Sequence, residues 1–232
     1  MKAINLRTEY LKDPMGIDIN DPRLLWNCEG GKKQTAYRIV AVSDGKTVWD
    51  SGKVNSSSMR AAYPRPLCSR QRVEWTVTLW DEEGKEGEPS EAACFEMGLL
   101  SPADWQAQWI AGDYRVDKKR RYPVDCFQKA FNAAGVKKAR LYVTACGLYE
   151  VKINGGRAGN FVLAPGHTDY TKRIQYQTYD VTELIKSGAN IITAELADGW
   201  YRGSCGAWGL LNEYGIETKL FVQLEQIGRA HV

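Results

Sequence analysis

Apolar and polar residues alternate along most of the chain, which predicts strands and little helix. The alternating runs are rich in β-branched and aromatic residues, and clusters of Gly, Asn, Asp and Ser bound them about every ten residues, a spacing typical of a β-sandwich. In the first half the pattern predicts strands over residues 36–42, 47–49, 73–80 and 93–97. One face of the third strand consists of Val73, Trp75, Val77 and Leu79. We expect this face to point into a core.

The first half therefore predicts one small sandwich domain over residues 1–98, of the immunoglobulin-like or fibronectin type III kind. Its charged stretch 81–89 is typical of an exposed turn. After residue 98 the alternation breaks, and Pro102 and two tryptophans indicate a linker over residues 99–125. Its basic run 118–121 is interpreted as a solvated face of that linker.

A second sandwich is predicted over residues 126–226. Its strands are expected at 126–131, 138–145, 148–153, 191–196 and 219–224. Asn154-Gly155 predicts a type I′ hairpin, because both residues tolerate a positive φ. Helix is expected only over residues 182–188, with Thr182 as N-cap and Gly188 as the stop.

The predicted last strand needs a neighbour, since an unpaired strand edge exposes a row of backbone donors and acceptors. Few residues follow it, so we expect the second sandwich to be incomplete at the C-terminus. Residues 227–232 also match an in-frame reading of a common sequencing-library adapter, which predicts a non-native tail. His231 in that tail is given no functional role.

Charge and hydropathy exclude several classes of partner. The 232 residues include 31 basic and 28 acidic side chains, and this near balance argues against a nucleic-acid partner. Apolar runs stay well below the roughly 20 residues of a membrane helix, so no membrane partner is predicted. The N-terminus lacks the apolar stretch of a secretion signal, and we therefore expect a cytoplasmic location.

Metal and nucleophilic chemistry find little support. The 6 cysteines include no CxxC pair, and only 2 histidines are present, so neither a metal site, a redox motif nor a Ser-His-Asp triad is indicated. The cysteines are interpreted as free thiols. No cofactor is predicted.

A site that hydrolyses glycosides would need two carboxyl groups about 5 to 9.5 Å apart. The candidates in the second half are Asp169, Asp180, Glu195, Asp198, Glu213 and Glu217. The sequence places no two of them across a cleft, so each is interpreted as a solvated group. Asp180 is interpreted as a turn or cap residue.

The loop at residues 197–209 is the main candidate site. It is rich in glycine and carries the candidate contact residues Asp198, Trp200, Tyr201, Arg202 and Trp208. Sugar rings pack on aromatic faces while charged groups bond their hydroxyls, so the loop suits contact with a carbohydrate or with a neighbouring domain. Alternatively, the two tryptophans cover the end of the core. The loop has no phosphate-binding glycine motif.

These motifs occur in an order that resembles the N-terminal, non-catalytic part of bacterial α-L-rhamnosidases. The first half is similar to their fibronectin-type module at residues 34–39, 48–54, 74–77, 98–100 and 104–105. The second half is similar to their N-terminal sandwich domain at residues 139–142, 147–150, 153–155, 163–170, 179–182 and 199–201. The resemblance implies two β-sandwiches, the second jelly-roll-like and galactose-binding-like, with a role in substrate recognition.

The resemblance further implies an enzyme that removes terminal α-L-rhamnose by inversion, with its acidic residues on an (α/α)-barrel further along. That barrel is absent from this sequence, so no catalytic residue is assigned and the chain alone is expected to be inactive. The implied partners are the C-terminal catalytic domain of the same chain and rhamnosylated glycosides. A free-standing carbohydrate-binding protein and a scaffold module without ligand stay open as alternatives.

Overall fold

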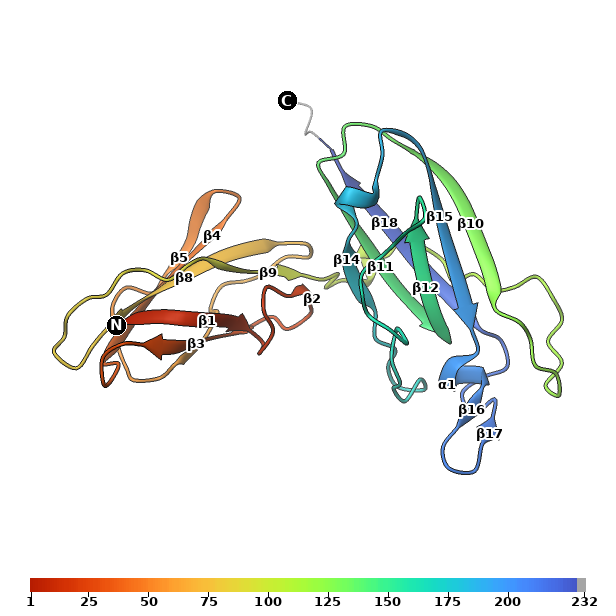
Figure 1. The fold of residues 1–232 in the computed structure, drawn as a ribbon, viewed down its shortest axis with the longest axis horizontal. Helices are drawn as coiled ribbons and strands as arrows, with labels where there is room; N and C mark the ends of the chain where they lie inside the picture. Colours follow the sequence, from red (N-terminus) through yellow and green to blue (C-terminus); the bar gives the residue numbers. More distant parts are fainter. Residues whose placement is uncertain (229–232) are drawn as a thin grey trace. The chain divides into compact units, whose positions relative to one another are not determined.

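The computed structural model describes residues 1–228, so His231 and residues 229–232 of the predicted tail lie outside the described part. The chain forms two compact units, Met1–Asp104 and the part from Trp105 onward. The regular secondary structure of both units is almost entirely strand (Figure 1). The all-β class and the pair of sandwiches are confirmed.

The first unit has two sheets. One contains β1 (Lys2–Thr8), β3 (Arg23–Glu29) and β7 (Arg60–Ala62). The other has the order β2 (Met15–Ile17), β9 (Ala93–Met97), β8 (Arg72–Trp80), β4 (Ala36–Ser43) and β5 (Lys46–Asp50), with β6 (Val54–Asn55) also beside β4. The four predicted strands of this half correspond to β4, β5, β8 and β9.

The inward face of β8 is confirmed. Its residues Val73, Trp75, Val77 and Leu79 are all buried to within 1% of full burial. Trp26 from β3 in the opposite sheet belongs to the same core, and Tyr63 packs edge-to-face on Phe95 with ring centroids 5.7 Å apart. The core of the first unit therefore lies between its two sheets and is closed by large aromatic side chains.

The second unit also has two main sheets. One has the order β10 (Asp125–Ala133), β15 (Gly188–Ala197), β12 (Leu148–Ile153) and β13 (Gly156–Arg157). The other has the order β14 (Gln177–Asp180), β11 (Lys138–Cys146) and β18 (Lys219–Ile227). A small hairpin of β16 (Ser204–Cys205) and β17 (Leu210–Leu211) follows the single-turn helix α1 (Gly199–Arg202).

The turn between β12 and β13 has the predicted geometry. Asn154 and Gly155 have φ values of 52° and 83°, as a type I′ hairpin requires. The Asn154 side chain also donates to the carbonyl of Leu184, 2.8 Å away, so the turn is tied to a segment 30 residues further on. The prediction of a type I′ hairpin from the residue pair Asn154-Gly155 is confirmed.

The predicted helix over residues 182–188 is wrong. Only a 3₁₀ turn (Thr182–Leu184) forms, and Thr182 is not its N-cap. Instead, the Thr182 hydroxyl donates to the carboxylate of Asp180, which also accepts the Thr182 N–H, as expected for a turn residue. Asn190 then bonds the backbone of Lys186 and Gly188, so these groups are satisfied outside a helix.

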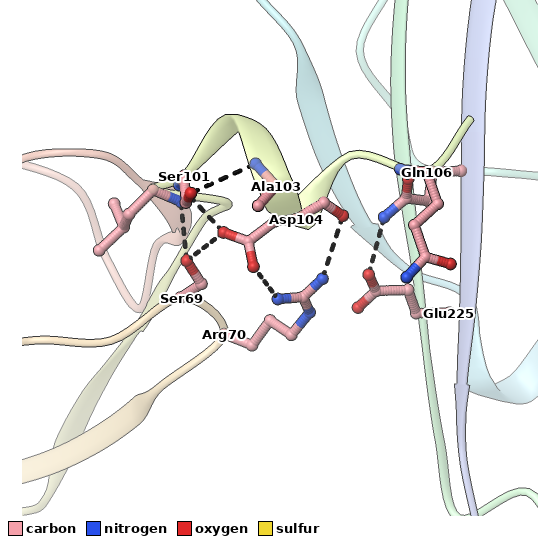
Figure 2. A network of polar contacts seen from close by, with 9 residues as sticks. Ser69, Arg70, Ser101, Ala103, Asp104, Gln106 and Glu225 are labelled. Carbon is pink, nitrogen blue, oxygen red and sulfur yellow. Dashed lines mark hydrogen bonds and ion pairs between the residues drawn. The ribbon is translucent and has the colours of Figure 1, made fainter. Parts of the chain in front are cut away.

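The segment between the sandwiches is bonded within each unit. In the first unit the Asp104 carboxylate accepts hydrogen bonds from Ser69, Arg70 and the Ser101 N–H (Figure 2). In the second unit the N–H groups of Gln106 and Ala107 donate to the Gln223 side chain. The structure thus divides the chain at Asp104, whereas the sequence predicted a linker over residues 99–125.

Candidate functional site

The loop with the five candidate residues begins where β15 ends. Gly199 has a φ of 52°, and a Cβ there would lie 2.6 Å from Leu148, so the chain leaves the strand by a turn that only glycine fits well. A Cβ at Gly203 would collide with the carbonyl oxygen of Gly199. Both glycines permit the tight single turn of α1, which carries Trp200, Tyr201 and Arg202.

Arg202 and Asp198 form a buried ion pair at the base of this loop. The Arg202 Nη2 lies 2.6 Å from the Asp198 carboxylate, and the arginine is only 6% exposed. Its Nη1 donates to the Tyr114 hydroxyl at 3.2 Å, and its guanidinium lies 5.0 Å from the ring centre of Tyr122. Burial alone would lower the pKa of Arg202, but Tyr114 and Asp198 outweigh it and raise the pKa. The pair therefore holds segment 114–122 to the loop.

Trp200 and Tyr201 belong to an aromatic cluster with three residues that the sequence interpretation did not assign. We call the set His167, Tyr170, Trp200, Tyr201 and Tyr214 the aromatic cluster. Its ring centroids are 5.4 Å apart for His167 and Trp200, 5.3 Å for Tyr170 and Tyr201, and 5.0 Å for Tyr170 and Tyr214. Burial raises the pKa of Tyr170 to about 12. Tyr170 is buried beneath its neighbours, Trp200, Tyr201 and Tyr214 are half-buried, and His167 is exposed.

Trp208 stands apart from this cluster in the β16–β17 hairpin. Its side chain is 90% exposed, so the interpretation that it covers the end of the core is wrong. Leu210 and Leu211 beside it are 52% and 47% exposed. The five candidate residues thus fall into a buried ion pair, two packed rings and one solvent-exposed indole.

A second loop with exposed apolar residues contacts the same hairpin. Phe161, Val162 and Leu163 are 50%, 65% and 59% exposed, and their loop continues to His167. The His167 Nε2 lies 3.9 Å from the Cys205 Sγ in the hairpin. We call residues 161–163 and 208–211 the exposed apolar loops. The resemblance at residues 163–170 was the only sequence signal for this side of the site.

The carboxylates that could serve hydrolysis have local partners. Asp169 bonds Thr171 and Lys172, and Asp180 bonds Thr182 and Arg140. Hydrogen bonds from Thr171 lower the pKa of Asp169. Burial opposes the same change at Asp180, yet its bonds to Thr182 and Arg140 still lower the pKa. A glycosidase acid needs a raised pKa, so both shifts run opposite to that role.

The remaining carboxylates behave like surface groups. Glu195 and Glu217 pair with Lys152 and Lys219, and Glu213 is exposed. Among residues 1–228 no group of three or more His, Cys, Asp or Glu side chains is arranged to hold a metal ion. Within the same range, no helix has the length and apolar character needed to cross a membrane.

Family models cover both units. The "Rha78A-like, N-terminal immunoglobulin domain" matches residues 3–101, and the "Alpha-L-rhamnosidase N-terminal domain" matches residues 134–228. The chain belongs to the α-L-rhamnosidase family. It corresponds to the N-terminal, non-catalytic region of these proteins. The family resemblance seen in the sequence is thereby confirmed.

Individual α-L-rhamnosidases agree with this assignment. One from Formosa agariphila is 38% identical over 94% of this chain. The crystal structure of the α-L-rhamnosidase from Aspergillus terreus covers 98% of the chain at 33% identity with a TM-score of 0.91. The structure of the α-L-rhamnosidase from Dictyoglumus thermophilum covers 97% of the chain at 33% identity with a TM-score of 0.83. The chain spans only 26% of the Formosa relative and 27% of each of the two solved structures, about a quarter of their length.

The name that the family model gives to the first unit differs from the fibronectin type III name predicted from the sequence. The family model describes the first unit as an immunoglobulin domain. The finer fibronectin type III name therefore stays a prediction. The domain limits expected from the sequence, 1–98 and 126–226, likewise stay predictions beside the division at Asp104.

Proposed function

We propose that this chain is the accessory part of an enzyme that releases terminal α-L-rhamnose from glycosides, and that it mainly docks the catalytic domain of that enzyme. Support for the activity of the whole protein comes from the relatives, which are named α-L-rhamnosidases. Support for docking comes from the exposed apolar loops. Singly exposed apolar residues are common, but monomeric proteins rarely expose large contiguous apolar patches, and such patches mark sites where a partner binds.

The 90% exposure of Trp208 is the observation that carries the docking role. A tryptophan whose surface is removed from water gains roughly 25 cal/mol per Å² of apolar area, and aromatic residues are the commonest anchors of protein interfaces. Five more apolar residues in the same two loops are between 47% and 65% exposed. A partner that covered them would bury a surface of mostly apolar character.

Contact with rhamnosylated glycosides is the secondary role that we propose. Sugar sites combine an aromatic face with polar groups that bond hydroxyls. Here the charged groups closest in sequence to Trp200 are Asp198 and Arg202, and they bond each other. This pairing favours a protein partner over a free sugar at the loop.

Indole N–H resonances of the ¹⁵N-labelled chain test the two roles directly. We expect the Trp208 resonance to broaden or shift when the remaining part of the Formosa agariphila relative is added. The Trp49 resonance, from a half-buried tryptophan of the first unit, is expected to stay in place. The variant Trp208→Ala should weaken the association, whereas Val124→Ala, at a residue 50% exposed elsewhere, should not.

A titration of the labelled chain with L-rhamnose tests whether sugar contact is the main role instead. Saturable shifts of Trp200 at low millimolar sugar, an affinity worth about 4 kcal/mol, would make sugar contact the main role if Trp200→Ala abolished them. No response of Trp208 to the catalytic part would count against docking through these loops.

The chain alone is expected to leave a chromogenic α-L-rhamnoside intact, because all but one of the carboxylates described above serve local ion pairs or turns and the remaining one, Glu213, is exposed. Turnover that persists through purification, and that Asp169→Asn or Glu213→Gln removes, would contradict this. The cytoplasmic location expected from the sequence stays a prediction for cell fractionation to test.

A further inference from the structure

An open apolar groove of about 680 Å³ runs along one side of the second sandwich. Its walls come from β10, β15 and β18 and from residues 106–108 and Ile110. The apolar side chains that line it include Phe127, Phe131, Ile192, Val222 and Leu224. All five also pack against the main core of this unit, so the groove is a continuation of that core.

The core is less well covered at the groove than at its centre. Leu141 and Val143 in the central strand β11 are completely buried, and Val151 in β12 is 2% exposed. The groove residues Phe127 and Leu224, by contrast, are only partly buried. Apolar side chains that face inward and still contact solvent indicate that a layer of packing is missing on this side.

The two strands that flank the groove are both the outermost strands of their sheets. β10 lies at one end of its sheet, and β18 lies at one end of the other. Leu220 exchanges backbone hydrogen bonds with Ile110, at 2.8 and 2.9 Å, on the side of β18 away from β11. Backbone groups alternate in direction along a strand, so those of Val222, Leu224 and Gln226 point to the same side.

Within residues 1–228, β18 pairs with no strand other than β11, and the bridge at Ile110 extends only to Leu220. Three successive outward-facing positions, Val222, Leu224 and Gln226, thus combine a free backbone edge with side chains in the apolar groove. An added strand would satisfy the backbone groups and cover the apolar side chains at once.

We propose that this groove receives an extended segment of the same polypeptide, supplied by the part of the rhamnosidase that follows residue 228, as an additional strand beside β18. The relatives provide such chain, since about three quarters of their length lies outside the part that this chain matches. Alternating apolar residues on the segment would face Phe127 and Phe131. This inference does not depend on the docking role of the exposed apolar loops.

Hydrogen exchange at single amides tests the proposal. The probe is a chimaera in which residues 227–232 are replaced by the roughly 60 residues that follow the matched region in the Formosa agariphila relative, enough for several strands. We expect the amides of Val222, Leu224 and Gln226 to exchange at least about tenfold more slowly in the chimaera, while Val143 in β11 is unchanged. Fluorescence of the dye ANS, which binds exposed apolar surface, should fall.

Matched variants separate strand addition from a general gain in stability. Leu224→Lys in the chimaera places a charge in the groove and should restore fast exchange and dye binding. Ile191→Lys, at a residue 44% exposed in β15 and outside the groove lining, should do neither. Trp208→Ala should leave the protection intact, which distinguishes this site from the docking loops.

Two outcomes would overturn the proposal. A folded chimaera whose three amides exchange as fast as in the original chain would show that the added segment does not occupy the groove. A dimer of the original chain, detected by light scattering and dissociated by Leu224→Lys, would assign the groove to a second copy.

Discussion

The two sandwiches of this chain differ in how completely they close around their cores. In the first unit, Trp26, Tyr63 and Trp75 are at most 2% exposed, and residues from both sheets surround them. In the second unit, the core extends into an open groove where Phe127 and Leu224 are only partly buried. The difference shows that alternation can build both sheets of a sandwich without completing the layer between them.

The largest effect is expected where the core is closed. Trp75→Ala removes a fully buried indole and should cost about 3 to 5 kcal/mol of the free energy of unfolding of the first unit. Urea unfolding followed by tryptophan fluorescence should show a midpoint at a lower urea concentration than in the unmodified chain. Met59→Ala, at a residue 49% exposed, is the control and should leave the midpoint unchanged. A loss below about 1 kcal/mol would contradict a tightly packed core.

Arg202→Ala should rank next, because it leaves the Asp198 carboxylate partly buried without its cation. We expect a loss of about 2 to 3 kcal/mol in the second unit, since hydrogen bonds to charged groups and buried pairs are costly to break. The control is Arg157→Ala, which breaks a more exposed pair with Glu150 and should cost less than about 1 kcal/mol. Similar losses for the two variants would argue against a structural role for Arg202.

Leu224→Ala probes the open side of the second core. Because this leucine is only partly buried, we expect a loss of about 1 to 2 kcal/mol, below that of Leu141→Ala at a fully buried position. Thermal unfolding of the two variants measures the difference. Equal losses would mean that the groove is already closed in solution, and the comparison between the two sandwiches would fail.

The smallest effect is expected at Asp104 and depends on pH. Hydrogen bonds from Ser69, then Arg70 and the Ser101 N–H, lower the pKa of Asp104 to about 2. The ionised group therefore stabilises the first unit above about pH 4, and this contribution is lost as the pH falls toward the folded-state pKa.

Asp104→Asn should accordingly lower the melting temperature of the first unit at pH 7 and lower it less as the pH approaches 2. Asp18→Asn, at an exposed position in the same unit, is the control. If the difference in melting temperature between Asp104→Asn and the unmodified chain stayed constant from pH 7 to pH 2, the loss of stability would not come from the ionisation of Asp104, and the prediction would be wrong.

Much of the fold could be predicted because strand signals are local. The predicted runs coincide with β4, β5, β8, β9, β10, β11, β12, β15 and β18. β1 was missed because its register shifts between Ile4 and Arg7, where Asn5 has a φ of 52° and the alternation is interrupted. β14 was missed because it is polar and short, and only Tyr179 in it is buried.

The candidate site was only partly predictable. Composition indicated the loop that holds Trp200, but it could not show that Arg202 bonds Tyr114, 88 residues earlier in the chain. Nor could it place His167 against Trp200 or leave Trp208 exposed. Each of these facts depends on a contact between distant segments.

Side-chain alternation and backbone φ preferences act over a few residues, so the order of amino acids was enough to predict the all-β class, the inward face of β8 and the Asn154-Gly155 turn. Contacts between distant segments were needed to place the edge strands, to bury particular charged groups and to leave the second core open on one side. Alternation tells which face of a strand turns inward but not which strand lies beside it. The groove lies between β10 and β18 because each of them is the end strand of its sheet, and packing across the whole unit determines which strands pair side by side.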